Sequence, residues 1–230
     1  MTSGSSASPS VPGPVRAVLF DSGGVLIRPI GGRWNPRADF EETVLRRRPT
    51  LTREEFAAAV EAGDRFMDAS PSTPDRDDYH RVMLHHLGVE PTAPLLAELR
   101  REIPPAQILE TYPDVVETLE ELERRGVRRA VVSDAWPELP DLHDALGIGR
   151  FFEAYAISAV LGCDKPDPRM YHHASTALGL DPAQCLFLDD DPELVRAAIA
   201  LGYAGRAVCR TPVETDVPSV SGLSEVLALV

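Results

Sequence analysis

The sequence predicts an α/β fold, in which a parallel β-sheet is covered by helices on both faces and carries an inserted helical bundle. Two observations support this prediction. From residue 113 onward, short apolar runs without polar alternation are separated by amphipathic segments. Strands of that kind are typical of parallel sheets that are buried on both faces. Between about residues 28 and 113, by contrast, we find no convincing strand but several helix patterns in succession.

Length and composition restrict the classes of protein to which the chain can belong. Its 230 residues suit one sizeable domain or a core domain with an insertion, and a hydrophobic fraction of 43% is enough to bury a core. The net charge of −13 argues against nonspecific binding to nucleic acid or to anionic membranes, and no apolar run is long enough to cross a bilayer. Three cysteines without CxxC spacing fit a reducing compartment. We therefore expect a cytoplasmic protein with no nucleic-acid or membrane partner.

The first strand follows an N-terminal segment that predicts no structure. Residues 1–14 are mostly Ser, Gly, Pro and Ala, so we expect a disordered tail. The apolar run 15–20 predicts a strand that ends in Asp21 and is followed at once by two glycines. Because Gly23 and Gly24 have no Cβ, the backbone there can approach a ligand closely.

The second block of the chain, residues 29–110, predicts helices only. Thr52 and Glu55 form a capping-box pattern at the start of one of them. The length and all-helical character of the block indicate an inserted small bundle, although the helices could instead simply cover the sheet. The predicted helices cover residues 35–48, about 52–66, 75–87 and 94–101.

The remaining residues, 111–230, alternate between strands and helices and would form one core domain with residues 15–28. Several of the helices end at a glycine, which favours the left-handed conformation of a helix C-terminus. The predicted strands are 127–132, 154–157, 185–188 and 207–209, and the predicted helices are 114–125, 137–146, 167–178, 192–201 and 223–229.

Polar residues follow these strands at the points where the strands end. Asp21 and Ser133 each end a predicted strand, and the run Asp189 to Asp191 ends a third. In parallel sheets, ligands bind beyond the carboxyl ends of the strands. Lys165 follows another strand after a loop, and it is the single lysine among 23 basic residues. A lone Lys in an arginine-rich chain indicates a place that requires a compact ammonium, with chance as the alternative.

With these residues in this order, the chain resembles the haloacid dehalogenase-like superfamily of hydrolases. The resemblance covers residues 15–208, and both the order and the spacing of the motifs agree. It implies a Rossmann-like core with a helical cap that closes over the active site. The motifs that carry it are Leu19-Phe20-Asp21, Val131-Val132-Ser133, Lys165-Pro166-Asp167-Pro168 and Leu188-Asp189-Asp190.

The resemblance implies a catalytic role for one residue in each of the first three motifs. Asp21 would be the nucleophile that forms a covalent intermediate, which water then hydrolyses. Ser133 would bind a phosphoryl oxygen, and Lys165 would neutralise charge between nucleophile and ligand. Gly24, three residues after Asp21, and Asp134, directly after Ser133, are expected to contact the substrate as well.

The resemblance also implies a magnesium site. Asp189 and Asp190 would hold Mg²⁺ together with Asp21 and the main-chain carbonyl of Gly23. Oxygen ligands of this kind are those that Mg²⁺ prefers, and the ion would offset repulsion between Asp21 and an anionic substrate. Asp191, directly before a proline, is expected to be a helix N-cap instead.

Two positions depart from the pattern of the family's phosphatases. These enzymes usually have a second Asp, which acts as general acid and base, where this chain has Gly23. The loss of such a group costs about 10²–10⁴-fold in rate. Ser22 and Asp134 are conceivable substitutes, but neighbours of a motif residue normally point away from the site. Leu194 stands where the last motif often has Asn or Asp.

Three functions are compatible with the sequence. The favoured one is a Mg²⁺-dependent phosphatase that acts on a small phosphorylated metabolite. The alternatives are a degenerate member that binds without turnover, which Gly23 favours, and a 2-haloacid dehalogenase, in which Arg33 or Arg37 would bind the substrate carboxylate. A phosphonate-cleaving member would need a lysine from the helical block, and residues 28–113 contain none. Trp34 could line the pocket, although burial in the cap is the interpretation that we prefer.

Overall fold

In the computed structural model, a six-stranded sheet with the order β5-β4-β1-β6-β7-β8 forms the centre of the larger domain. Every neighbouring pair of these strands is parallel, as predicted. The structure describes residues 14–30, 32–37, 39–101 and 103–230, so the predicted tail lies outside the described residues except for Pro14. The strands are β1 (Ala17–Phe20), β4 (Arg128–Ser133), β5 (Ala154–Ile157), β6 (Cys185–Asp189), β7 (Ala204–Val208) and β8 (Ser219–Val220).

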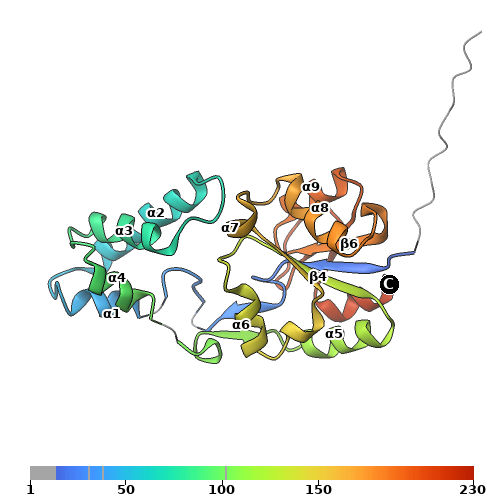
Figure 1. Ribbon diagram of the computed structural model, residues 1–230, viewed down its shortest axis with the longest axis horizontal. Coiled ribbons are helices and arrows are strands. Elements are labelled where there is room, and N and C mark those ends of the chain that lie inside the picture. Colours follow the sequence, from blue (N-terminus) through green and yellow to red (C-terminus); the bar gives the residue numbers. More distant parts are fainter. Residues whose placement is uncertain (1–13, 31, 38, 102) are drawn as a thin grey trace, which may run out of the picture.

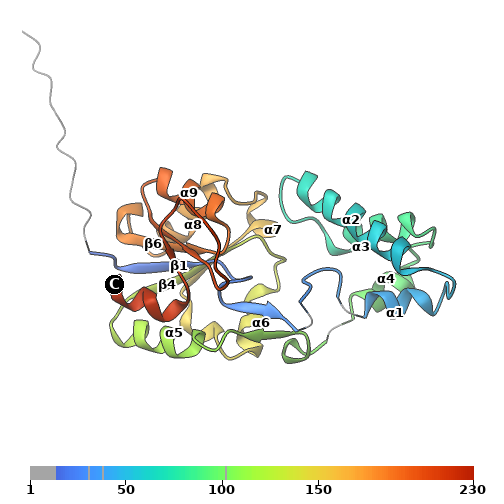
Figure 2. The ribbon, with the colours of Figure 1, turned by 180° about the vertical axis from the view of Figure 1, so that it is seen from behind.

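Helices cover both faces of this sheet. They are α5 (Val115–Arg124), α6 (Leu139–Ala145), α8 (Pro168–Ala177) and α9 (Pro192–Ala200), with the 3₁₀ segment η4 (Leu223–Ala228). Alternate residues of a strand point to opposite faces, so Val18 and Phe20 pack with α5, α6 and η4. Ala17 and Leu19 pack with α8 and α9. Figures 1 and 2 show the two helical layers on either side of the sheet. This is the predicted Rossmann-like α/β core.

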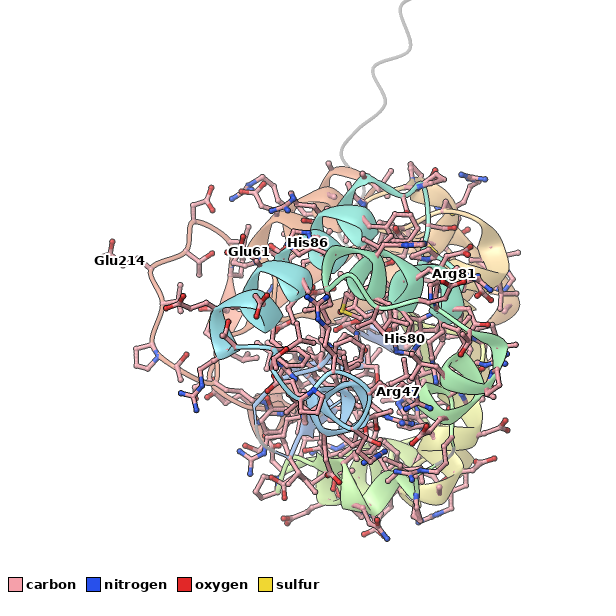
Figure 3. The ribbon with its side chains drawn as sticks, turned by 90° about the vertical axis from the view of Figure 1, so that its left-hand side faces the viewer. Arg47, Glu61, His80, Arg81, His86 and Glu214 are labelled. Carbon is pink, nitrogen blue, oxygen red and sulfur yellow. The ribbon has the colours of Figure 1, made fainter. Side chains whose placement is uncertain are left out.

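A separate helical block is inserted after β1. It contains α1 (Phe40–Leu45), α2 (Arg53–Ala69), α3 (Arg76–His86) and α4 (Ala93–Leu99). The helices bury their own apolar cluster, which includes Phe40, Phe56 and Tyr79, and they stand apart from the sheet (Figure 1). Charged side chains such as Arg47 and Glu61 lie on the outer surface of the block (Figure 3). The helices therefore form a separate inserted block with its own apolar cluster, and they do not simply cover the sheet.

Two short strands connect the core with the helical block, where the sequence predicts no strand. β2 (Ile27–Pro29) and β3 (Leu109–Thr111) pair antiparallel. The prediction was wrong because each strand is only three residues long, too short to give an alternating pattern. The pair places the entry and the exit of the helical block side by side.

Other boundaries also differ from those predicted. Helix α1 begins at Phe40 and not near residue 35, and the last predicted helix is the 3₁₀ segment η4. The short elements α7 (Ser158–Leu161) and β8 were missed. Strand β7 begins at Ala204, whereas the sequence predicts its start at residue 207. Gly205 interrupts the apolar pattern of the strand, and it lies against α9, since a Cβ there would be 2.8 Å from Ile199 Cγ1. Among the residues described, no helix is long and apolar enough to span a bilayer.

Candidate active site

The carboxyl ends of three neighbouring strands bring the predicted polar residues together. β1 is hydrogen-bonded to β4 on one side and to β6 on the other. Asp21 directly follows β1, and its backbone N–H donates to Leu188 O of β6 at 2.8 Å. Ser133 ends β4 and Asp189 ends β6. All three polar side chains are buried at one edge of the sheet.

Lys165 completes this cluster from the loop between α7 and α8. Its Nζ donates to Asp21 Oδ1 at 2.8 Å and to Asp189 Oδ2 at 2.7 Å, and the residue is only 8% exposed. Burial alone would lower the pKa of Lys165, but Asp21 and Asp189 outweigh burial and raise it well above its usual value. The single lysine is therefore a charged ammonium between two carboxylates.

The carboxylates outnumber the ammonium in this cluster. Oxygen atoms of Asp21, Asp189 and Asp190 lie within 4.8 Å of one another. Burial and the nearby Asp21 raise the pKa of Asp190 to about 6, and burial also raises the pKa of Asp189, although Lys165 opposes both shifts. Crowded oxygen ligands with excess negative charge favour a hard divalent cation. The residues present thus fit Mg²⁺.

Gly24 makes room for this arrangement. Its φ of +74° is in the left-handed region, and a Cβ there would lie 2.1 Å from Asp190 Oδ2. Its N–H donates to Ile27 O at 3.0 Å, and a contact of Gly24 with substrate stays a prediction. Asp191 accepts the backbone N–H of Glu193 at 2.8 Å, so the predicted N-cap of α9 is confirmed.

The loop after β4 is fixed to the lysine loop. Asp134 Oδ1 accepts the backbone N–H of Lys165 at 2.9 Å. Burial among the cleft walls raises the pKa of Asp134 to about 6, while Lys165 opposes the rise. Part of Asp134 nevertheless remains open to solvent in the cleft. Asp134 is therefore a partly accessible carboxyl group with a raised pKa that lines the same cleft as Asp21.

Gly23 lies against an aromatic ring from the segment that leads into the cap. A Cβ on Gly23 would lie 3.2 Å from Cζ2 of Trp34. Trp34 is 44% exposed, so the interpretation that it is buried in the cap was wrong. The place beside Asp21 where a second acid could stand is thus occupied by an indole edge.

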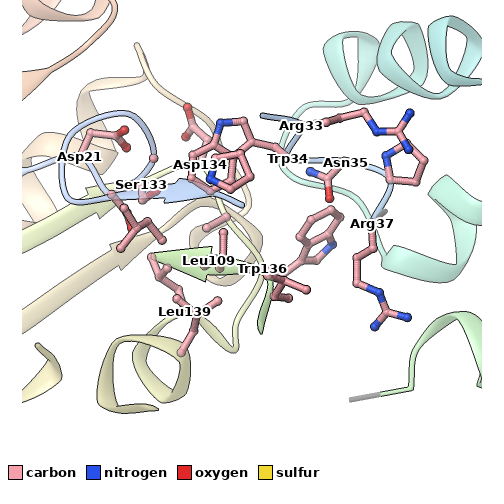
Figure 4. A pocket seen from close by; sticks show the side chains of 18 of the residues that line it. Asp21, Arg33, Trp34, Asn35, Arg37, Leu109, Ser133, Asp134, Trp136 and Leu139 are labelled. Atoms are coloured by element: carbon pink, nitrogen blue, oxygen red, sulfur yellow. The ribbon is translucent and has the colours of Figure 1, made fainter. Parts of the chain in front are cut away.

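These residues lie at one end of a chamber between the core and the cap (Figure 4). Its volume is about 480 Å³, and its walls include Trp34, Trp136, Leu109 and Leu139. Of the residues predicted to form the site, all except Gly24 line this chamber. Arg33 and Arg37 also line it, but they pair with Glu41 at 3.3 Å and with Asp39 at 3.1 Å.

Two neighbours of the candidate site, His143 and Tyr155, were not predicted from the sequence. Ser22 Oγ is 2.8 Å from Nε2 of His143, whose Nδ1 is 3.2 Å from the Tyr155 hydroxyl. Burial lowers the pKa of His143 to about 4, so it is neutral. The only signal was its spacing of four residues from Leu139 on the buried side of α6. The hydroxyl of Ser22 is committed to this buried histidine, which argues against a role as proton donor.

Curated relatives of the chain include phosphatases. "Phosphatase MT3486" from Mycobacterium tuberculosis is 31% identical over 120 residues, which are 50% of this chain and 55% of the relative. "Phosphoglycolate phosphatase 1" from Pseudomonas aeruginosa is 34% identical over 119 residues, 50% of this chain and 43% of the relative. The chain spans about half the length of the curated relatives that it matches.

Solved structures share the fold over nearly the whole chain. The L-2-haloacid dehalogenase from Xanthobacter autotrophicus superposes with a TM-score of 0.65 at 20% identity, covering 94% of this chain and 98% of that one. A HAD phosphatase from Thermococcus onnurineus gives a TM-score of 0.64 at 18% identity, covering 92% and 96%. The family described as haloacid dehalogenase-like hydrolase matches residues 15–202, a range that contains every residue of the candidate site. The chain therefore belongs to the haloacid dehalogenase-like hydrolases.

Proposed function

We propose that this hydrolase is a Mg²⁺-dependent phosphatase that acts on a small phosphorylated molecule through an aspartyl-phosphate intermediate. The observation that carries the proposal is the cluster of three carboxylates within 4.8 Å around one ammonium. Residues 29–110 would serve as the cap that covers the substrate. The curated phosphatase relatives support the same reaction class.

Asp21 would be the nucleophile. Lys165 holds its Oδ1, and Oδ2 is not hydrogen-bonded within the described part of the chain. Attack of Oδ2 on phosphorus forms a carboxyl–phosphoryl bond and breaks the bond from phosphorus to the leaving oxygen. Water then attacks the same phosphorus, which releases phosphate and restores the Asp21 carboxylate.

Other residues of the cluster would bind and neutralise the phosphoryl group. Ser133 can donate its hydroxyl to a phosphoryl oxygen, and Lys165 supplies a positive charge next to the nucleophile. Asp21, Asp189 and Asp190, with the carbonyl of Gly23, would hold Mg²⁺. A bound Mg²⁺ reduces the repulsion between a carboxylate nucleophile and an anionic phosphoryl group.

The acidic cluster also separates this proposal from dehalogenation. Displacement of halide from a 2-halo acid requires no cation, and the excess carboxylates would repel the acid's own carboxylate. The arginines that could bind that carboxylate, Arg33 and Arg37, are already paired with acidic side chains. Phosphate transfer with a cation uses the cluster, whereas dehalogenation leaves it without a role.

An activity assay with two substrates tests the proposal. We expect the protein to release phosphate from 4-nitrophenyl phosphate in the presence of Mg²⁺ and to lose this activity after addition of EDTA. Excess Mg²⁺ should restore it. The same preparation should release no chloride from 2-chloropropionate.

Two outcomes would contradict the proposal. Chloride release that survives chelation would establish the dehalogenase instead. Binding of Mg²⁺, measured by calorimetry, without release of phosphate or chloride would indicate a binding protein without turnover.

Replacement of Gly24 by Ala should weaken Mg²⁺ binding. The positive φ alone costs an L-residue about 1–2 kcal/mol, and the new Cβ would also displace the Asp190 carboxylate. We expect urea unfolding to show the backbone cost and calorimetry to show at least about tenfold weaker Mg²⁺ binding, in line with the loss of support for a ligand.

The matched control is Gly126→Ala. Gly126 has a φ of +70°, and a Cβ there would meet nothing within 4 Å. This variant should therefore lose similar stability and keep its affinity for Mg²⁺. Equal Mg²⁺ affinity in the two variants would argue against Asp190 as a ligand.

A further inference from the structure

The chamber in front of Asp21 is much larger than a phosphoryl group. Its volume of about 480 Å³ is within the range of pockets that hold drug-sized ligands. The acidic residues are concentrated at the end near Asp21, and Ile30, Leu99, Leu109 and Leu139 give the remainder apolar walls. Arg33, Arg37 and Arg76 line the remainder as well, but their guanidinium groups pair with Glu41, with Asp39 and with the Trp136 ring. The part of the substrate that does not react therefore meets a largely apolar space.

Two indole rings contribute to this apolar space (Figure 4). Trp34 lies against Gly23, and its 44% exposure leaves part of the ring free to contact a ligand. Trp136 is held in place from the cap, because its Nε1 donates to Pro74 O at 2.8 Å and the Arg76 guanidinium lies 4.6 Å from its ring centre. Aromatic rings pack favourably on such surfaces.

The cap end of the chamber contains buried polar atoms without partners. Tyr79 is 1% exposed and His80 is 6% exposed, and both line the chamber. The Tyr79 hydroxyl and His80 Nδ1 have no hydrogen-bond partner among the described residues. Both atoms are closed off from solvent, so neither offers a hydrogen bond to a ligand in the chamber. His80 is neutral because burial and nearby arginines lower its pKa to about 4.

The reacting end of the chamber sets a requirement for the leaving group. Gly23 and the edge of Trp34 offer no proton donor on their side of Asp21. A phenol has a pKa of about 10, whereas an alkyl alcohol has a pKa close to the 15.7 or so of water. A phenolic oxygen therefore departs with less need of a proton than an alkoxide does.

We propose that the substrate is the phosphate ester of an aromatic hydroxyl compound, whose ring lies in the chamber against Trp34. This inference rests on the proposed phosphatase function and assigns its substrate class. The apolar walls select the ring, and the lack of a donor at Gly23 selects the phenolic leaving group.

Two series of compounds test recognition and reactivity separately. In the first, kcat/KM is compared for phenyl, 2-naphthyl, benzyl and ethyl phosphate with Mg²⁺ present. We expect phenyl and 2-naphthyl phosphate to exceed ethyl phosphate by at least about 100-fold, since general-acid catalysis is typically worth about 10²–10⁴-fold. Benzyl phosphate, which has a ring but an alkoxide leaving group, should resemble phenyl phosphate in KM and ethyl phosphate in kcat.

In the second series, binding is measured without turnover by calorimetry with phenylphosphonate and methylphosphonate. Phenylphosphonate should bind about tenfold more tightly, as expected for one aromatic contact. Trp34→Ala should remove most of this difference. Ile199→Ala, at a half-exposed position of α9 that does not line the chamber, is the control and should keep the difference.

The outcomes distinguish this inference from the proposed function. Ethyl phosphate within about threefold of phenyl phosphate, or equal binding of the two phosphonates, would overturn the aromatic substrate class and leave a Mg²⁺-dependent phosphatase. Absence of phosphate release from every ester would overturn the phosphatase, while the phosphonate comparison would still decide whether the chamber binds aromatic rings.

Discussion

Asp21→Asn is expected to lower phosphate release by roughly 10⁴-fold or more, as the loss of a nucleophile does in other enzymes. A carboxamide has no negative charge and cannot form the acyl-phosphate bond. Its shape is the same, and Lys165 keeps its 2.7 Å contact with Asp189, so the fold should survive. Steady-state phosphate release and thermal unfolding, measured on the same preparation, check both expectations.

A control for this variant is available on the same edge of the sheet. Asp191→Asn removes an equal charge two residues beyond Asp189, but its side chain caps α9 through the backbone N–H of Glu193. Asn caps helices about as well as Asp does. This variant should keep activity within about threefold. Similar activity in Asp21→Asn and in the wild type would mean that another group is the nucleophile.

The sequence was sufficient to predict the core because its signals are local and strong. Continuous apolar runs such as that of β1, followed by amphipathic helices closed by glycine, have few alternative structures. The short connecting strands β2 and β3 were missed because they depend on pairing between residues about 80 positions apart, as in Ile27 with Thr111. No local pattern reports such a pairing.

Among the residues of the candidate site, too, some could be predicted from local signals and others depend on tertiary packing. Asp21, Ser133, Lys165 and Asp189 could be brought together from the rule that strand ends share one edge. Trp34 could not, because its place depends on Gly23, whose missing side chain leaves room for the ring at 3.2 Å. The chamber wall is thus a property of tertiary packing between core and cap.

Lys165→Met is expected to cost about 3–5 kcal/mol of folding stability, because it removes one partner of a buried ion cluster. The methionine fills a similar volume, but Asp21 and Asp189 then face each other without the ammonium that lies within 2.8 Å of both. Asp134 and Asp190 add further negative charge nearby. Urea unfolding of the wild type and of the variant measures the difference.

The loss of folding stability in Lys165→Met should become larger as the pH rises. Burial already raises the pKa of Asp189 and Lys165 opposes the rise, so removal of Lys165 raises that pKa further. An Asp in the unfolded chain has a pKa of about 3.9. At pH values between that pKa and the raised pKa of Asp189 in the folded variant, the folded variant binds a proton that the unfolded chain does not bind. Stability of the variant therefore falls as pH rises through that interval, and the deficit should be larger at pH 8 than at pH 5.

The double variant Lys165→Met/Asp189→Asn provides the matched control. It removes one buried carboxylate together with the ammonium, so it should recover much of the lost stability and show a weaker dependence on pH. Mg²⁺ should stabilise Lys165→Met more than the wild type, because a cation among the three carboxylates replaces the missing positive charge. A deficit that is the same at both pH values and with or without Mg²⁺ would mean that Lys165 contributes packing and not charge.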